Sequence, residues 1–166
     1  EPRDGYLGLQ AEIPGGGQFE FKDITVTELG YRSLFNGTDL SGWEGGQGEA
    51  AACWKAEEGM LMCTGRPGPW LRSRDRFGDF NLRLEYLVAK GGNSGVYVRV
   101  PEDGNHHREN DTLPPAGFEV QILDDFDYER VMKTTLKPWQ FCGSLYGCVP
   151  PKVKALNPLG EWNTYA

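Results

Sequence analysis

Apolar and polar residues alternate strictly in the middle of the chain, whereas helical periodicity is nearly absent. Successive side chains of an extended strand point to opposite faces, so this pattern predicts strands with one face in a core. In the second segment, for example, Val96 and Val98 fall on one face, and Tyr97 and Arg99 on the other. The three clearest predicted strands are NLRLEYLV (81–88), SGVYVRV (94–100) and FEVQIL (118–123).

The segments around these strands carry turn signals. WKAEEGMLMC (54–63) predicts a hairpin that turns at Glu58-Gly59. Residues 101–115 are polar and rich in Asn, His and Pro, which predicts a long loop, and such loops are usually functional or mobile. Residues 124–141 fit a strand least well and predict an irregular excursion with one helical turn.

The opening of the chain predicts a second hairpin. Residues 6–10 and 19–29 flank a Pro-Gly-Gly-Gly turn. The apolar spacing becomes three between Phe21 and Ile24, which predicts a β-bulge. The sequence from residue 30 to residue 44 then reads like the start of a new domain.

Composition agrees with a sheet protein and excludes some functions. The chain has 166 residues, enough for one domain, with 23 Gly and 11 Pro. Its formal charge of −7 and the lack of a Lys/Arg stripe argue against nucleic acid as a partner. No stretch approaches the ~20 apolar residues of a membrane span. The chain begins with neither Met nor a signal peptide, so we expect a fragment, a processed form or a trimmed chain.

Cysteine and histidine give little support for a zinc site. None of the cysteines forms a C-x-x-C pair, and the two histidines, His106 and His107, are adjacent in the long loop. Two interpretations of the cysteines stay open: local disulfides between consecutive ones, or small buried hydrophobes. The four cysteines are Cys53, Cys63, Cys142 and Cys148.

Five strings follow one another along the chain: SLFNGTDLSGW (33–43), FGDFNLRLEYLVAKGGNSGVYVRV (77–100), GFEVQILD (117–124), GSLYG (143–147) and GEWNTY (160–165). Together, and in this order, they resemble the 3-keto-disaccharide hydrolase family, a group of glycoside hydrolases once known as a domain of unknown function. The resemblance implies a concanavalin-like jelly roll, in which two antiparallel sheets pack face to face and the concave one holds a sugar. It also implies cleavage of the glycosidic bond of sugars oxidised at carbon 3, by proteins that bacteria secrete or export to the periplasm.

The order of the segments departs from that family. Residues 1–30 resemble the hairpin that closes the family's domain, and 31–166 resemble its body without the final strands. The chain therefore represents either a cut from a tandem array or a circular permutation, and its closing strands could also come from another chain. Because a jelly roll without its closing strands leaves unpaired edges, we expect 1–30 to pack on 31–166.

Strand parity predicts a shared polar face. Tyr97, Arg99, Glu119 and Gln121 fall on the face opposite the core residues. Such a face could hold a sugar through planar polar groups and an aromatic ring. For the remaining outward residues of 81–88, we prefer solvated cross-strand pairs; these are Arg83 and Glu85.

The resemblance, rather than parity, makes Glu119 and Gln121 functional candidates. A keto group at carbon 3 acidifies the proton at carbon 2, so cleavage by elimination needs a general base and a general acid. Glu119 is the predicted catalytic acid or base and Asp124 the second carboxylate. Arg99, or a metal, would stabilise the enolate oxygen. Direct hydrolysis by two carboxylates is the alternative.

Each further candidate has a structural interpretation beside the functional one. Asn93 could bind sugar hydroxyls or tolerate a left-handed turn, and Tyr146 is the preferred aromatic sugar contact. Trp139 and Trp162 could stack on sugars or fill the core. The acidic cluster within 124–129 could hold a divalent cation or be a solvated turn, so the cofactor stays unknown and no metal ligand is named.

The sequence thus predicts an all-β domain that cleaves 3-keto-glycosides. Two rival functions remain: a carbohydrate-binding module that does not turn its ligand over, and an interaction domain of a larger multidomain protein. The jelly roll serves all of them, so fold does not choose. Closely spaced carboxylates in a closed cleft would favour the enzyme, and an open groove lined by aromatic rings would favour the module.

Overall fold

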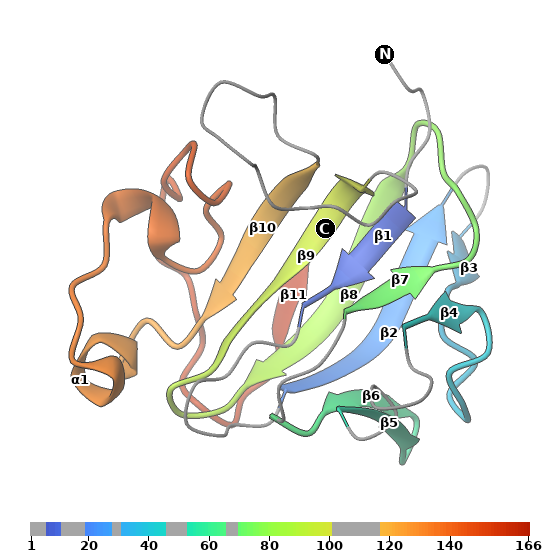
Figure 1. Ribbon diagram of the computed structural model, residues 1–166, viewed down its shortest axis with the longest axis horizontal. Coiled ribbons are helices and arrows are strands. Elements are labelled where there is room, and N and C mark those ends of the chain that lie inside the picture. The colour runs from blue at the N-terminus through green and yellow to red at the C-terminus, as the bar shows by residue number, and fades with distance from the viewer. Residues whose placement is uncertain (1–5, 11–18, 28–30, 46–52, 66–69, 101–116) are drawn as a thin grey trace.

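Two antiparallel sheets pack face to face in the computed structural model, which describes residues 6–10, 19–27, 31–45, 53–65, 70–100 and 117–166. We call them the front sheet and the back sheet, as they lie in Figure 1. The front sheet has the strand order β10-β9-β1-β7-β4, and the back sheet has the order β11-β8-β2-β6-β5. A further strand, β3, pairs with β2. This two-sheet sandwich is the predicted all-β fold.

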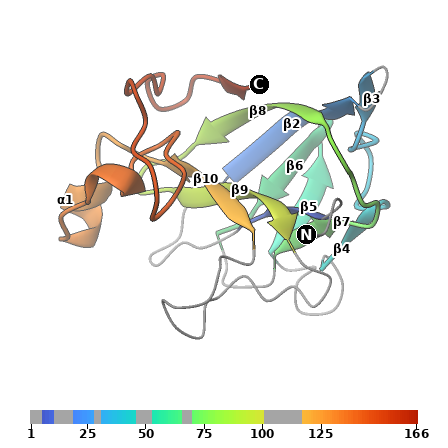
Figure 2. The same cartoon turned by 90° about the horizontal axis from the view of Figure 1, so that it is seen from above.

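The elements are short and joined by turns. The front sheet contains β1 (Tyr6–Leu9), β4 (Trp43–Glu44), β7 (Leu71–Ser73), β9 (Asn93–Val100) and β10 (Phe118–Leu123). The back sheet contains β2 (Phe19–Thr27), β3 (Tyr31–Ser33), β5 (Trp54–Glu57), β6 (Met60–Cys63), β8 (Asn81–Val88) and β11 (Asn163–Tyr165). The helices are α1 (Tyr128–Met132) and the 3-10 turn η2 (Pro138–Gln140). Seen from above, α1 lies at one side of the sandwich, away from β3 and β4 (Figure 2).

The apolar halves of the alternating strands meet between the sheets. The front sheet contributes residues such as Leu9, Val96 and Ile122, and the back sheet contributes Phe21 and Leu84, all at most 2% exposed. Burial of each such side chain stabilises the fold by about 1.5–3 kcal/mol. Their outward neighbours are thereby fixed on the two outer faces.

Most of the local predictions are confirmed. The three alternating segments form β8, β9 and β10, and residues 54–63 form the hairpin β5–β6. Glu58 and Gly59 both have positive φ angles, 51° and 77°, as a two-residue hairpin turn requires. In β2 the register against β8 shifts between Lys22 and Thr25, which is the expected bulge.

The predicted opening hairpin is wrong, because its two strands belong to different sheets. β1 lies between β9 and β7, and β2 lies between β8 and β6. Each strand fills a gap that would otherwise leave the backbone groups of two neighbours unpaired. The expectation that this part of the chain packs on 31–166 is confirmed for β1 and β2. Its origin from a tandem array or a permutation stays a prediction.

The four cysteines are free thiols, so the disulfide alternative is wrong in this structure. Cys53, Cys63 and Cys142 are buried, as the alternative of small hydrophobes predicted, whereas Cys148 is exposed. Burial raises the pKa of the Cys63 thiol to about 11. Within the described ranges, no helix has the length and apolar character needed to cross a membrane.

Candidate functional site

A row of outward residues crosses the front sheet from edge to edge. In the register of the strands, Glu119 lies opposite Tyr97, Tyr97 opposite Gly8, Gly8 opposite Arg72, and Arg72 opposite Glu44. Directly opposed residues of neighbouring strands project to the same side. We call these five residues the polar row. It brings together residues more than a hundred positions apart in the sequence.

Glu119 is held tightly at the β10 end of the polar row. It is 8% exposed, and its Oε2 accepts a hydrogen bond of 2.7 Å from the Tyr97 hydroxyl. The rest of the carboxylate lies over Gly95, where a Cβ atom would come within 2.2 Å of Glu119 Oε1. The Glu119 side chain therefore occupies the space that a side chain at position 95 would need.

The Gln121 amide extends this contact along β10. In one orientation its nitrogen donates to Asn93 Oδ1 at 2.9 Å. In the other it lies 3.2 Å from both Glu119 Oε1 and the Ser94 carbonyl oxygen. We favour the second orientation because it satisfies two acceptors at once. The Gln121 oxygen then lies 2.9 Å from the atom assigned as Asn93 Oδ1, so the Asn93 amide turns with it and donates through its nitrogen. Asn93 in turn lies 3.3 Å from the hydroxyl of Tyr128 on α1.

Asn93 begins strand β9 and is not a left-handed turn residue. The positive φ angle, 70°, belongs to Gly91, two residues earlier. The turn interpretation of Asn93 is therefore wrong. Of the predicted binding residues, the structure brings Asn93, Tyr97 and Gln121 together around Glu119.

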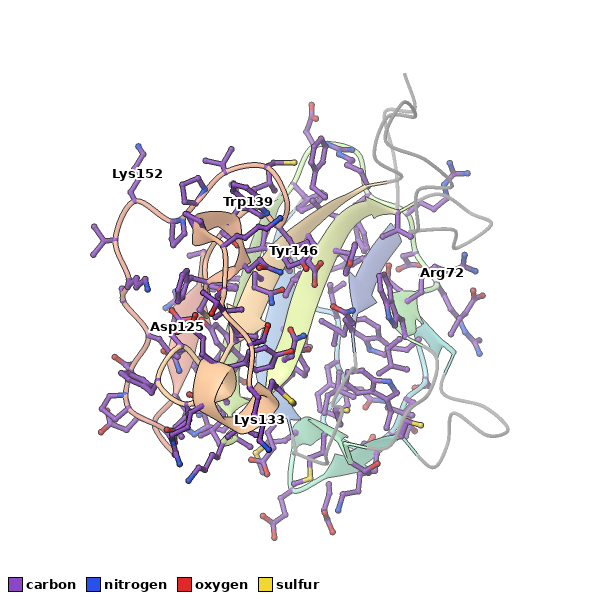
Figure 3. The ribbon with its side chains drawn as sticks, turned by 60° about the vertical axis from the view of Figure 1, so that its left-hand side comes forward. Arg72, Asp125, Lys133, Trp139, Tyr146 and Lys152 are labelled. Carbon is purple, nitrogen blue, oxygen red and sulfur yellow. The ribbon has the colours of Figure 1, made fainter. Side chains whose placement is uncertain are left out.

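Tyr146 borders the polar row beyond β10. Val120 and Leu145 form a bridge, and the Tyr146 N–H donates to the Glu119 carbonyl at 2.9 Å. The segment that contains Leu145 and Tyr146 therefore runs along the edge of β10. The Tyr146 ring is 43% exposed, and its hydroxyl accepts from Gln140 Nε2 at 3.1 Å. Figure 3 shows Tyr146 beside β10, with Arg72 across the sheet.

Arg99 does not join this group, so its predicted position is wrong. Its φ angle is +61°, which interrupts the alternation of β9. The guanidinium donates to the Phe77 carbonyl at 3.4 Å and lies 3.6 Å from Asp79 Oδ1. It also lies over the Phe80 ring, with the guanidinium carbon 5.5 Å from the ring centroid. Arg99 thus contacts the chain that leads from the front sheet to the back sheet.

Asp124 is not placed to act as the second catalytic carboxylate, so that prediction is corrected. It has no exposed surface, and its oxygens accept three backbone N–H groups. One donor is Gly91, in the turn before β9, at 2.7 Å, and the others are Phe126 and Asp127, at 3.1 Å. A carboxylate that accepts three hydrogen bonds from the backbone holds that backbone in place. Here it ties the turn before β9 to the start of α1.

The other acidic residues of this segment engage separate protein donors. Asp127 accepts from Arg130 Nη2 at 2.6 Å, and Asp125 Oδ1 accepts from the Cys142 N–H at 2.8 Å. Burial raises the pKa of the Asp125 carboxyl, and the Cys142 N–H partly opposes this rise. In the part of the chain that the structure describes, no three His, Cys, Asp or Glu side chains converge to hold a metal. His106 and His107 lie outside the described residues.

The outer face of the back sheet carries cross-strand pairs. Lys22 lies opposite Glu85, and their charged groups are 3.4 Å apart. The preferred interpretation of Glu85 is therefore confirmed, and Arg83 is exposed on the same strand. Lys22 also lies over the Trp162 ring, 4.1 Å from its centroid. Trp162 thus packs on the back sheet, whereas Glu119 lies on the front sheet. Trp139, the other candidate, is 36% exposed.

Three further residues lie on this face but have no clear signal in the sequence: Trp70, Arg72 and Glu44. The rings of Trp70 and Tyr97 lie 4.0 Å apart between centroids, tilted by 37°. Arg72 forms an ion pair with Glu44. Strands β7 and β4 have three and two residues, too few to show alternation. The available signal was the order Trp-Leu-Arg-Ser in 70–73, which puts an aromatic and a cationic residue on one face.

Comparison with known proteins agrees with this architecture. Residues 30–166 match the model of the 3-keto-alpha-glucoside-1,2-lyase-like domain. The chain belongs to this family. Strands β1 and β2 precede the matched residues. Nevertheless, β1 lies inside the front sheet and β2 lies inside the back sheet.

Two relatives illustrate the family. The chain is 31% identical over 153 residues to a 3-keto-disaccharide hydrolase of Bacteroides thetaiotaomicron, covering 84% of this chain and 52% of that protein. It thus spans about half the length of this curated relative. A crystal structure from Parabacteroides distasonis, provisionally described as a glycosyl hydrolase, matches with a TM-score of 0.61 and 28% identity. That match covers 81% of this chain and 62% of the other.

Proposed function

We propose that this domain cleaves the glycosidic bond of 3-keto-glycosides on the outer face of the front sheet, with Glu119 as the acid/base residue. The observation that carries the proposal is the Glu119 carboxylate itself. It is nearly buried, seated over Gly95, and hydrogen-bonded by the Tyr97 hydroxyl. A positioned carboxylate beside a phenol can both take and return a proton. The names of the family and of its relatives supply the substrate class.

The proposed reaction is elimination followed by hydration. Glu119 takes the proton from carbon 2, and the electron pair of that C–H bond forms a double bond between carbons 1 and 2. The bond from carbon 1 to the glycosidic oxygen breaks, and that oxygen leaves with the proton that Glu119 took from carbon 2 and now returns. Water then adds a hydroxyl to carbon 1 and a proton to carbon 2. During the first step the carbon-3 carbonyl oxygen gains charge, which a donor such as Tyr97 would stabilise.

The spacing of carboxylates on this face favours elimination over direct hydrolysis. Glycosidases of the direct type place two carboxyl groups about 5–9.5 Å apart. Among the described residues of the polar row, the second carboxylate is Glu44, four strands away from Glu119. With strands ~4.8 Å apart, this separation is roughly 19 Å. One carboxylate with a neighbouring phenol suits proton transfer at carbon 2 better than double displacement.

A carbohydrate-binding module is the second candidate function. The observation that favours it is the aromatic contact between Trp70 and Tyr97 on the same face as Glu119. Aromatic faces pack against the apolar side of a sugar ring whether or not the sugar reacts. The two functions therefore share a binding face and differ in what happens when Glu119 loses its charge.

The experiment that separates them uses Glu119→Gln, with Glu85→Gln on the back sheet as the matched control. Release of the aglycone from a 3-keto-glucoside is measured for both variants, with and without a chelator. We expect Glu119→Gln to lower kcat about 100-fold or more, because general acid/base catalysis contributes 10²–10⁴-fold. Glu85→Gln is expected to match the parent protein.

Three outcomes would redirect the proposal. Unchanged turnover by Glu119→Gln would remove that residue from the mechanism. Sugar binding without any turnover by the parent protein would favour the binding module. Loss of turnover in chelator, restored by a divalent cation, would add a metal to the site.

A further inference from the structure

A hollow lies between the edge of the back sheet and residues 142–157, away from the polar row. Its walls come from β8, from β11 and from the irregular segment that joins β10 to β11. Its volume is about 340 Å³. A cavity of ~150 Å³ already holds benzene, so this hollow has room for one substituted ring.

Two aromatic side chains line the inner end of the hollow. Tyr86 of β8 and Tyr165 of β11 have ring centroids 4.6 Å apart. Their hydroxyls lie 3.4 Å and 3.3 Å from the Cys142 thiol. The Tyr165 hydroxyl also donates to the Gln121 carbonyl oxygen at 2.6 Å. Since these polar atoms bind one another and the backbone, the inner end offers a ligand aromatic and apolar surface.

The outer wall of the hollow is apolar as well. Pro151, Val153 and Leu156 line it, and Val153 is 74% exposed. Apolar surface that stands in water next to a hollow favours a ligand with a hydrocarbon body, because binding removes both surfaces from water. A small sugar or a bare inorganic ion has no such body.

The segment that closes the hollow is basic, although the chain is acidic. Residues 131–160 contain four lysines and no Asp or Glu, whereas the whole chain has a formal charge of −7. Lys154 lies over the Phe141 ring, 3.1 Å from its centroid, and its charge partly opposes the rise in the pKa of Asp125 that burial causes. Lys152 lines the hollow, is exposed, and projects outward in Figure 3. Lys152 is therefore the cation that can meet an anionic group of a ligand.

We infer that this hollow is a second ligand site, which binds a small aromatic carboxylate with its ring toward Tyr165 and its carboxylate on Lys152. The segment 141–146 separates this site from the polar row. From it, the Gly143 N–H donates to the Gln121 carbonyl at 2.8 Å, and the Tyr146 N–H donates to the Glu119 carbonyl at 2.9 Å. The inference concerns binding alone and does not depend on the proposed function.

The test titrates isotope-labelled protein with three probes: benzoate, its neutral analogue benzamide, and acetate, which lacks the ring. The backbone amide signals of Gly143 and Thr164, two residues that line the hollow, report binding by nuclear magnetic resonance. Benzoate should shift both signals in a saturable way. Benzamide should bind about threefold more weakly, because an exposed ion pair contributes a factor of about this size. Acetate should show no saturable shift.

Variants locate the two halves of the ligand. Lys152→Ala should lower the affinity for benzoate about threefold and leave that for benzamide unchanged. Lys133→Ala is the matched control, since Lys133 is an exposed lysine of the same basic segment. Ala155→Trp should fill the hollow and abolish saturable binding of both ring probes. Should that variant fail to fold, Val153→Glu replaces it, because a carboxylate at this exposed position should repel benzoate and spare benzamide.

Several results would overturn the site. One is the absence of a saturable shift at Gly143 and Thr164 with benzoate. Equal affinities for benzoate and acetate would mean adventitious binding of an anion, and equal affinities for benzoate and benzamide would remove the carboxylate from the inference. The same loss in Lys152→Ala and Lys133→Ala would also contradict it. The role of Glu119 is measured by turnover and is untouched by any of these results.

Discussion

The outer faces of the two sheets obey the same alternation but differ in how their side chains lie. On the back sheet, Lys22 and Glu85 form a pair with both side chains 32% exposed. On the front sheet, Glu119 lies down over Gly95 and is nearly buried. The difference comes from outward-facing glycines, which let neighbouring side chains rest on the backbone. Alternation therefore identifies a face, whereas the small residues within it indicate which face forms a site.

The sharpest test of this comparison uses the two glycines that face outward on the front sheet. Gly95→Ala should displace Glu119, because the new Cβ would stand 2.2 Å from Oε1, and a displacement of about 1 Å can cost about 100-fold in rate. Gly8→Ala would make only ordinary contacts of 3.5 Å or more. The measurement is kcat/KM on methyl 3-keto-α-glucoside for both variants. Similar losses would mean that the room above Gly95 does not position Glu119.

A second test concerns the buried carboxylate at the end of the front sheet. Asp124→Asn replaces one acceptor oxygen by a donor and breaks at least one charge-assisted bond to a backbone N–H. We expect a loss of about 1.5–3 kcal/mol in the free energy of unfolding, measured with urea. Asp39→Asn is the matched control, since Asp39 also accepts a backbone N–H but lies in an exposed turn. A loss no larger than that of the control would show that Asp124 does not anchor the fold.

The back-sheet pair should matter little. Lys22→Ala removes an ion pair in which both side chains are about one-third exposed, and such pairs contribute about 0–1 kcal/mol. Thermal unfolding should therefore change slightly, and turnover of a 3-keto-glucoside should not change. A loss of turnover in Lys22→Ala would contradict the assignment of the site to the front sheet.

The smallest expected effect is a pH dependence that arises outside both faces. Burial raises the pKa of Asp125, so the folded protein holds this proton to a higher pH than the unfolded chain does. The corresponding stability is present at low pH and is lost as the pH rises through the raised pKa. Asp125→Asn should therefore raise Tm relative to the parent at pH 7 but not at pH 3. A Tm difference that is the same at both values would contradict this expectation.

Local strand patterns were predictable from the sequence because one face of each strand meets the core. In the sequence, alternation is visible along β8, in residues 96–100 of β9, and along β10. Pairing partners were not predictable in the same way. The glycine-rich link between β1 and β2 suggested a hairpin, yet each strand pairs with strands far along the chain. A turn sequence constrains only the residues next to it in the chain. The partners of a strand depend instead on which place in each sheet the rest of the fold leaves open.

The site was predictable where parity held and not where the backbone departed from it. Tyr97, Glu119 and Gln121 lie together as expected, but the positive φ of Arg99 turns its side chain toward Asp79. Asp124 was predicted as the second carboxylate from its place in a motif. The three backbone N–H groups that donate to it could not be predicted from the sequence. Trp70 and Arg72 were missed because a three-residue strand carries no period.

The central position of β1 has a consequence for how the domain folds. Its partners lie at Leu71–Arg72 and at Val96–Val100, so its pairings close loops of about sixty to ninety residues. Pairings this remote in sequence raise the contact order, which slows folding and prolongs exposure of strand edges. On the ribosome, β1 must wait until β9 has emerged before it can be paired on both sides. The polar row is therefore completed late, only after the chain has closed its longest loops.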